Sequence, residues 1–321
     1  MSKIREVQDA DALPPVIKAA TEPLILAPGI HTISMEEYLA IPAFASGLAH
    51  TILTASPRHA WTDSWLNPNL EPWNSEVADI GTYAHACLLE GGTSALHMVD
   101  ADDWRTKAAQ GQRDQARAEG KLPILARKVS QVEAMVKAAR AYIAASEIAG
   151  IFDSGKAEQT LIWSESMVAC EVLCKARPDW LSETILLHYK TTKASVNPLS
   201  FSRTASNMGY DVAMMFYLRG LEAVKPDHEA QHFLLAQEQI EPFACKLFDL
   251  SAPLADVAAH KVSRAINAWA SCMNSGKWPA YDGAIHSIEL KPWDLQQAVD
   301  VGDINGLGYD PEIAGEFGVQ A

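Results

Sequence analysis

Apolar residues recur every three or four positions over residues 128–146 and define one stripe of a predicted helix. The stripe consists of Val129, Val132, Met135, Val136, Ala139 and Ile143. A period near 3.6 residues indicates a helix with one buried face. A second apolar pattern, in "VADIGTYAHACLLEGG" (residues 77–92), predicts a buried helix that ends at Gly91 and Gly92.

Four further helices are predicted from capping residues and breakers. "SMEEYLA" begins with Ser34 as N-cap, with Glu37 at the capping-box position. "SGLAHTILTASP" is stopped by Pro57. One helix is expected from about Phe201 to Ala223, and a longer one over residues 252–275 that ends at Gly276.

Four runs rich in β-branched and aromatic residues are of strand length. The first three, "EQTLIWSES", "VACEVLCKARPD" and "ETILLHYKTT", predict an antiparallel meander, and "EAQHFLLAQEQ" predicts one further strand. The order of helix, three strands, helix and strand predicts an α/β core, a mixed sheet flanked by helices.

Composition divides the chain into three predicted parts. Residues 1–30 are interrupted by four prolines and are interpreted as an N-terminal arm. Residues 31–294 form the expected domain. Residues 295–321 contain no Lys or Arg and accumulate acids, so they are expected to form a flexible acidic tail. The sequence shows neither a secretory signal nor an apolar spanning run, so we expect a cytoplasmic protein with no membrane partner.

Charge is distributed unevenly along the chain. A net charge of −14 argues against a protein that coats nucleic acid with its whole surface. A local basic stretch, from Arg105 to Lys128, is ordinarily interpreted as a solvated face, and the family resemblance described below implies a loop that follows DNA as the alternative. On the second interpretation the candidate DNA-binding residues are Arg105, Lys107, Arg113, Arg117 and Lys121. We expect residues 105–123 to form either a mobile loop or a solvated helix end.

The five cysteines are odd in number and show no CxxC pair, so neither a disulfide framework nor a structural zinc site is indicated. Cys170 and Cys174 are expected to pack on one sheet face, with a metal role as the minor alternative.

Candidate chemistry lies in "RPDWLSETILLHYKTTKAS", residues 177–195. Asp179 opens the stretch and Lys190 follows an apolar run. Metal-assisted hydrolysis of a phosphodiester needs oxygen ligands for the cation, and a nearby lysine can orient water or stabilise charge on the phosphate. The simpler interpretations are that Asp179 caps a turn and that Lys190 extends to solvent.

Six segments carry a resemblance to a known family: "GTYAHACLLEG", "EQTLIW", "ARPDWL", "LLHYKTT", "MGYDVAMMFYLRGL" and "SGKWPAY…IELKPW". In order and spacing they resemble the RecE-type exodeoxyribonucleases, the exodeoxyribonuclease VIII-like branch of the PD-(D/E)xK nucleases, which phages and prophages carry. The resemblance covers roughly residues 32–293.

The resemblance implies a PD-(D/E)xK core and a set of site residues. His85 matches the helix histidine that joins the metal site, although a lone histidine on an apolar helix is more often packed in the core. Asp179 and Lys190 match the first acid and the lysine, and Glu158 is a weaker candidate for a site acid. The carbonyl of Tyr189 would complete the metal shell.

The resemblance also implies an activity and partners. These are 5′ to 3′ exonuclease action on double-stranded DNA ends, Mg²⁺ dependence, a ring-shaped homo-oligomer and an associated single-strand annealing recombinase.

Two departures affect the expected site. The family's second acid is His188 here, and its helical glutamine is Ala213. His188 could coordinate a softer cation such as Mn²⁺, hydrogen-bond to Asp179, or fill space. The alternative function is therefore a catalytically inactive nuclease fold, needing no metal, that binds DNA or a protein partner.

Overall fold

The computed structural model describes residues 24–70, 80–90 and 96–288. The chain divides into two compact units, residues 1–280 and residues 281–321. The described part of the second unit, residues 281–288, has an irregular backbone. The predicted acidic tail and residues 1–23 of the predicted arm lie outside the described residues.

Three short helices follow the first strand; the first two were predicted, the capping of the first is confirmed, and the third was not predicted. Helix α1 (Met35–Ala40) begins with a capping box, in which the Glu37 N–H donates to Ser34 Oγ and the Ser34 N–H donates to the Glu37 carboxylate. Helix α2 (Ser46–Thr54) ends before Pro57. Helix α3 (Pro57–Thr62) then uses that proline as its first residue.

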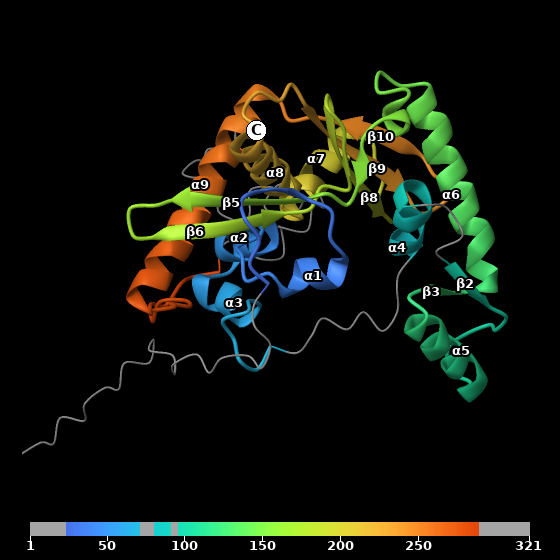
Figure 1. Cartoon of the computed structure of the whole chain (residues 1–321), viewed down its shortest axis with the longest axis horizontal. Coiled ribbons are helices and arrows are strands. Elements are labelled where there is room, and N and C mark those ends of the chain that lie inside the picture. Colours follow the sequence, from blue (N-terminus) through green and yellow to red (C-terminus); the bar gives the residue numbers. More distant parts are fainter. Residues whose placement is uncertain (1–23, 71–79, 91–95, 289–321) are drawn as a thin grey trace, which may run out of the picture. The chain divides into compact units, whose positions relative to one another are not determined.

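The strands that the structure describes in the first unit form three sheets (Figure 1). The first has the order β1-β5-β6 and is antiparallel, with strands Gly29–His31, Thr160–Ser166 and Glu171–Ala176. The second has the order β10-β9-β8-β7-β4, with strands Cys245–Phe248, Gln231–Glu238, Ile185–Thr192, Trp180–Leu181 and Lys156–Ala157. Only β8 and β9 are parallel neighbours in it. The third sheet pairs β2 (Leu96–Val99) with β3 (Leu122–Leu125) in parallel.

The α/β class with a mixed sheet flanked by helices is confirmed, but the predicted meander is divided between two sheets. The first two runs form the hairpin β5-β6, and the third is β8 in the five-stranded sheet. Pro178 lies between β6 and β7. Since proline has no N–H to donate, it interrupts a ladder at this point and the chain enters the second sheet.

The remaining helices flank the sheets. They are α4 (Ile80–His85), a π-helical turn (Ala86–Glu90), α5 (Lys107–Ala118), α6 (Ala126–Ala144), a 3-10 turn (Ile151–Asp153), α7 (Pro198–Asn207), α8 (Tyr210–Val224) and α9 (Ala252–Ser275). The single helix predicted over residues 201–223 is wrong, because Gly209 has φ +68° and breaks it. A side chain there would also collide with the ring of His50.

The basic stretch is a helix rather than a loop. Thr106 caps α5, and along the helix only Ala109 and Ala116 are buried. Of the two predicted alternatives, the mobile loop is wrong for residues 107–118, and the solvated helix is a whole helix rather than a helix end, because capping and the packing of two small side chains stabilise it.

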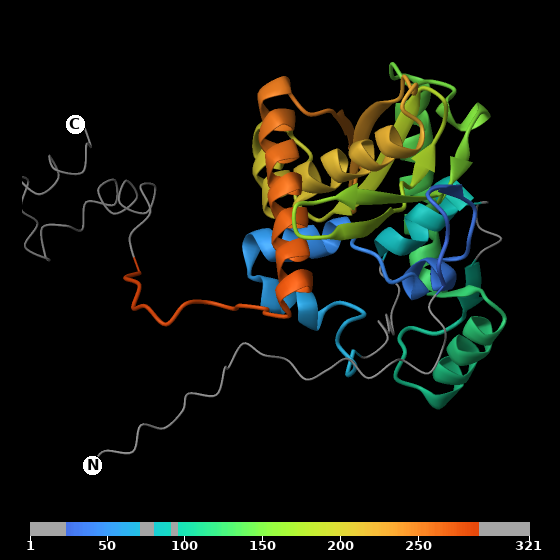
Figure 2. The ribbon, with the colours of Figure 1, turned by 60° about the vertical axis from the view of Figure 1, so that its left-hand side comes forward.

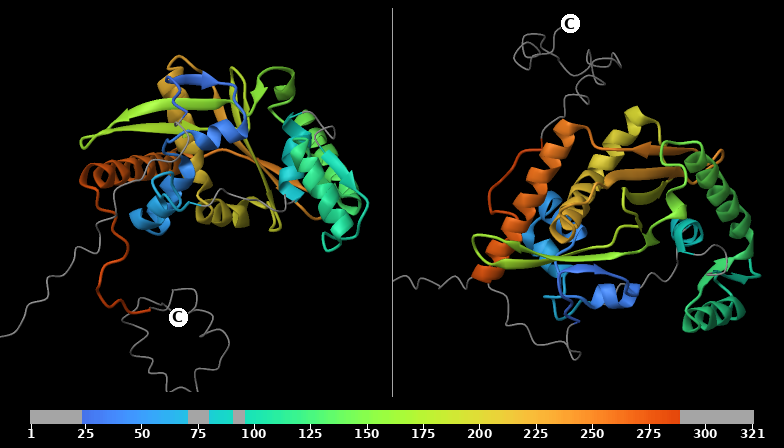
Figure 3. Two further views of the ribbon diagram at one scale, coloured as in Figure 1. Left: turned by 60° about the horizontal axis from the view of Figure 1, so that its bottom comes forward. Right: turned by 45° about the horizontal axis from the view of Figure 1, so that its top comes forward.

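The helices cover both faces of the five-stranded sheet. Helices α4 and α6 pack together against the face that carries Leu187, Tyr189 and Leu235 (Figure 3). The opposite face, with Leu186, shares a core with β5, β6, α8 and α9. Helix α9 also runs against α2, as Figure 2 shows. The five cysteines form no disulfide, and Cys174 is buried in this second core.

Candidate metal centre

Three segments that are distant in the sequence meet beside one cleft of about 730 Å³. His85 and Glu158 line this cleft, and the buried side chain of Asp179 contacts His85. His85 is the last residue of α4, Glu158 lies between β4 and β5, and Asp179 immediately precedes β7. Lys190, near the end of β8, also lines the cleft. The structure therefore brings together four of the residues singled out from the sequence.

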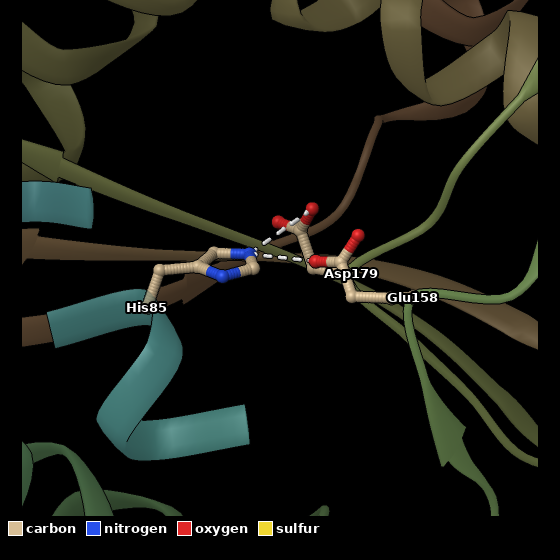
Figure 4. A group of neighbouring side chains, drawn as sticks. All are labelled: His85, Glu158 and Asp179. Atoms are coloured by element: carbon tan, nitrogen blue, oxygen red, sulfur yellow. Dashed lines mark ion pairs between the residues drawn. The ribbon is translucent and has the colours of Figure 1, made fainter. Parts of the chain in front are cut away.

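Three of these residues present ligand atoms to a common point. His85 Nε2 lies 3.4 Å from Asp179 Oδ1 and 3.5 Å from Glu158 Oε1 (Figure 4). The three ligand atoms all lie within 4.8 Å of one another. In the described parts of the chain, no other group of three or more His, Cys, Asp or Glu side chains has this arrangement.

This donor set fits a divalent cation. Cis ligands of an octahedral ion with bonds of about 2.1 Å are about 3 Å apart. The two separations from His85 Nε2, 3.4 Å and 3.5 Å, are close to this value. Two carboxylate oxygens suit Mg²⁺ and Mn²⁺, and one imidazole nitrogen is better matched to Mn²⁺ than to Mg²⁺. The residues present can hold either ion.

The second oxygen of Asp179 is occupied by the protein. Asp179 Oδ2 lies 2.9 Å from His188 Nδ1 and accepts the Tyr189 N–H at 2.7 Å. The ammonium of Lys190 lies 3.6 Å from the same oxygen. Of the three roles considered for His188, the structure shows the hydrogen bond to Asp179, and the triad of ligand atoms does not include His188.

Charge states follow from burial and these contacts. Burial raises the pKa of Asp179, but the Lys190 ammonium and His188 outweigh burial and hold it well below its usual range. Burial and the Lys190 charge lower the pKa of His188, which makes the neutral ring the dominant form at pH 7. A neutral His188 therefore donates its Nδ1–H to the carboxylate of Asp179.

The pKa of His85 is raised, whereas that of His188 is lowered. Burial lowers the pKa of His85, but hydrogen bonds to Asp179 and Glu90 and the charges of Asp179 and Glu158 raise it to about 10. The pKa of Glu158 is raised by burial and by Asp179, against the opposing effect of His85 and Arg177. In the metal-free protein His85 is thus a cation at neutral pH, and a metal ion must displace its proton.

Glu158 is held by Arg177, which the sequence analysis did not select as a site residue. The Arg177 Nε–H donates to Glu158 Oε2, and Arg177 Nη1 donates to Ile33 O at 2.9 Å and to Thr160 Oγ1 at 3.0 Å. Glu158 itself has φ +55°, a conformation that non-glycine residues adopt only under local constraint. Arg177 therefore fixes the third ligand and joins it to the segment before α1.

Tyr189 was expected to offer its carbonyl to the metal, and that role remains a prediction. Its buried ring stacks on the ring of His85, with centroids 6.1 Å apart, and its hydroxyl donates to Gln237. The observed contribution of Tyr189 is to support the His85 ring and to donate its N–H to Asp179.

The five predicted DNA-binding residues lie on and around α5, and none is among the described residues that line the cleft. Lys121 is the nearest in sequence, since its neighbours Gly120 and Leu122 line the cleft. Three of the five have acidic neighbours: Arg105 with Asp103, Arg113 with Asp114, and Lys121 with Glu119. Lys107 opens α5 and Arg117 lies in its last turn.

Comparison with known proteins adds a family. Residues 53–291 match the family described as "PDDEXK-like domain of unknown function (DUF3799)". No curated protein matches the sequence.

Two solved structures show limited similarity. One is a "putative exonuclease" from Eubacterium rectale, with 12% identity and a TM-score of 0.49, covering 83% of this chain and 98% of that one. The other, SSO0001, has 10% identity and a TM-score of 0.25, covering 49% of this chain and 69% of that one. Among the described residues, no helix is long and apolar enough to cross a membrane.

Proposed function

Because the chain belongs to the family of the PDDEXK-like domain of unknown function (DUF3799), we propose that it is a metal-dependent nuclease that hydrolyses phosphodiester bonds of DNA. The observation that carries this proposal is the convergence of ligand atoms from His85, Glu158 and Asp179, with Lys190 beside Asp179 and with His85, Glu158 and Lys190 lining one cleft. Two acids and an imidazole can hold a divalent cation, and an ammonium can stabilise charge on a phosphodiester as it is hydrolysed.

The side chains have distinct roles in this proposal. His85, Glu158 and Asp179 would hold the cation, which supplies charge neutralisation at the phosphate and a more acidic water. Asp179 is kept ionised and fixed in orientation by His188 and the Tyr189 N–H. Lys190, one-third exposed toward the cleft, would donate hydrogen bonds to the attacking water or to a phosphate oxygen.

The finer assignment follows the resemblance to the exodeoxyribonuclease VIII-like branch. We propose a phage-type enzyme that degrades double-stranded DNA ends from 5′ to 3′ for recombination, as a homo-oligomer that works with a single-strand annealing recombinase. Mg²⁺ and Mn²⁺ are the proposed cofactors. The preference for Mn²⁺ now comes from His85, since His188 bonds Asp179 instead.

The direct test is digestion of duplex DNA labelled at the 5′ or the 3′ end, in Mg²⁺ and in Mn²⁺. We expect release of 5′-terminal nucleotides first. Lys190→Ala should lower the rate by about 10² to 10³, because it removes a charge-assisted donor from the reacting groups. The matched control is Lys193→Ala, an exposed lysine three residues further along, which should cut at the wild-type rate.

A second candidate function is supported by one observation. His188 occupies the position of the expected second acid and donates to Asp179, so the site has one carboxylate fewer than the family pattern. A nuclease fold that binds DNA or a protein without cutting would agree with this. Absence of cleavage in either metal by the wild type and by His188→Asp, with duplex binding retained, would establish the second function and exclude the first.

A further inference from the structure

A π-helical turn directly follows the histidine of the metal centre. Helix α4 ends at His85, and residues Ala86–Glu90 form the turn. In an α-helix, a side chain five positions after His85 would lie about 140° around the axis and face another direction. The wider turn of a π-helix, with hydrogen bonds from i to i+5, instead returns residue i+5 to the same face.

The returned residue is Glu90, and it contacts the other ring nitrogen of His85. Glu90 Oε1 lies 3.4 Å from His85 Nδ1, whereas Nε2 faces Glu158 and Asp179. Figure 4 shows one ring nitrogen directed at the two carboxylates and the other directed away from them. The two nitrogens are therefore divided between the metal centre and Glu90.

The turn is fixed by the core and by an arginine. Cys87, Leu88 and Leu89 are buried against α6, so the turn cannot rotate freely. Arg140 of α6 donates to the Leu88 carbonyl at 3.2 Å, which satisfies a backbone group within the turn. The position of Glu90 beside His85 is thus a consequence of buried packing, although the Glu90 side chain itself is 45% exposed.

We propose that Glu90 is a positioning residue for the metal centre. By accepting the Nδ1–H of His85, it holds the ring so that Nε2 presents its lone pair to a cation. Carboxylate partners of this kind orient histidine ligands and raise their basicity, and their loss typically weakens metal affinity by about 10- to 100-fold. The inference depends on the proposed function only in requiring that the triad binds a divalent ion.

The test is a double-mutant cycle in which Mn²⁺ affinity is measured on the full chain by calorimetry or electron paramagnetic resonance. Glu90→Gln should weaken Mn²⁺ binding by about 10- to 100-fold in the wild-type background and hardly at all when His85→Ala has removed the ring. Glu133→Gln is the matched control, because it removes an exposed carboxylate of neighbouring helix α6 and should leave the affinity unchanged.

Two results would overturn the inference. One is an equal loss from Glu90→Gln in both backgrounds, which would mean that Glu90 acts by its charge alone. The other is wild-type affinity in Glu90→Gln. If the protein cuts DNA, saturating Mn²⁺ should restore most of the Glu90→Gln rate, which a general loss of structure would not allow. If the wild type binds Mn²⁺ tightly but cuts no DNA, the proposed nuclease function is excluded. The double-mutant cycle would still test the role of Glu90.

Discussion

The two oxygens of Asp179 face two different environments. Oδ1 lies on the cleft side, near His85 and Glu158, whose side chains are 22% and 13% exposed. Oδ2 lies on the buried side, where His188, 4% exposed, and the Tyr189 N–H both bond to it. The cleft side contains groups able to bind a cation, and the buried side contains hydrogen-bond donors. One oxygen of this carboxylate is thus available to a cation, and the other holds the Asp179 side chain in place.

This difference changes the role of His188, the residue that stands where the nuclease resemblance predicts a second acid. A histidine at position 188 would weaken the centre if it were a missing ligand. In the structure His188 instead lies on the buried side of Asp179, where its neutral imidazole donates a hydrogen bond to the carboxylate. The cleft side has its own second acid in Glu158, which Arg177 holds in place. The acids of this centre therefore come from the two segments that precede β5 and β7.

The largest effect is expected from Asp179→Ala, which removes both carboxylate oxygens at once. The cleft loses a ligand, and activity should fall on the order of 10³-fold. Each buried donor left without an acceptor should cost roughly 1–3 kcal/mol of unfolding free energy. The matched variant, Asp179→Asn, keeps an acceptor oxygen but no charge. It should lose metal binding while its unfolding free energy, from urea titration, stays closer to the wild type. Equal destabilisation by both variants would contradict the assignment of different roles to the two oxygens of Asp179.

The second prediction concerns pH and separates the cleft side from the buried side. His85 is protonated in the metal-free protein, with a pKa of about 10, so each bound cation displaces one proton. We expect metal affinity to rise by about tenfold per pH unit between pH 7 and pH 9. Calorimetry in buffers of different ionisation enthalpy measures the released proton directly. Binding without proton release would exclude His85 as a ligand.

The stability of the metal-free protein provides a companion measurement. Because the folded pKa of His85 is raised above its ordinary value of 6.5, the protonated ring contributes stability that is fully present below pH 6.5. This contribution is lost as the pH rises toward 10. The free energy of unfolding should therefore decline over this range in the wild type, and the decline should be smaller in His85→Gln.

The smallest effect is expected from His188→Asp, which places a second carboxylate on the buried side. Without metal, the like charges of residues 179 and 188 should lower the free energy of unfolding by about 1–3 kcal/mol. With Mg²⁺ the added charge should increase affinity on the order of tenfold. His188→Asn, which removes the imidazole without adding charge, should show no gain. A gain in the asparagine variant would contradict the electrostatic explanation.

Local signals in the sequence predicted much of the helical structure. Ser34 with Glu37, and Gly276 after a long apolar stripe, give the ends of α1 and α9 because capping depends on neighbouring residues alone. Strands β4 and β7 are only two residues long and were not predicted as separate strands. Such short strands are stabilised by pairing with distant segments, and the local pattern of residues does not indicate that pairing.

The candidate site was predicted in two ways. The pattern around residues 177–195 selected Asp179 and Lys190, the family resemblance added His85, and the structure places the three together. Arg177 and Glu90 were not selected. Arg177 acts on a residue 19 positions away, and Glu90 lies five residues after His85, which is off the histidine's face in the α-helical pattern applied to the sequence.

Arg177 also has a practical consequence for where the chain can be cut. The family match begins at residue 53, but two structural features depend on residues before it. The guanidinium of Arg177, which restrains Glu158, donates to the carbonyl of Ile33, and β1 (Gly29–His31) pairs with β5. A recombinant fragment limited to residues 53–291 would discard this tether and one edge of a sheet. Such a truncation should retain most of its helices while releasing its cation more readily, so a negative cleavage assay on it would be uninformative about the intact protein.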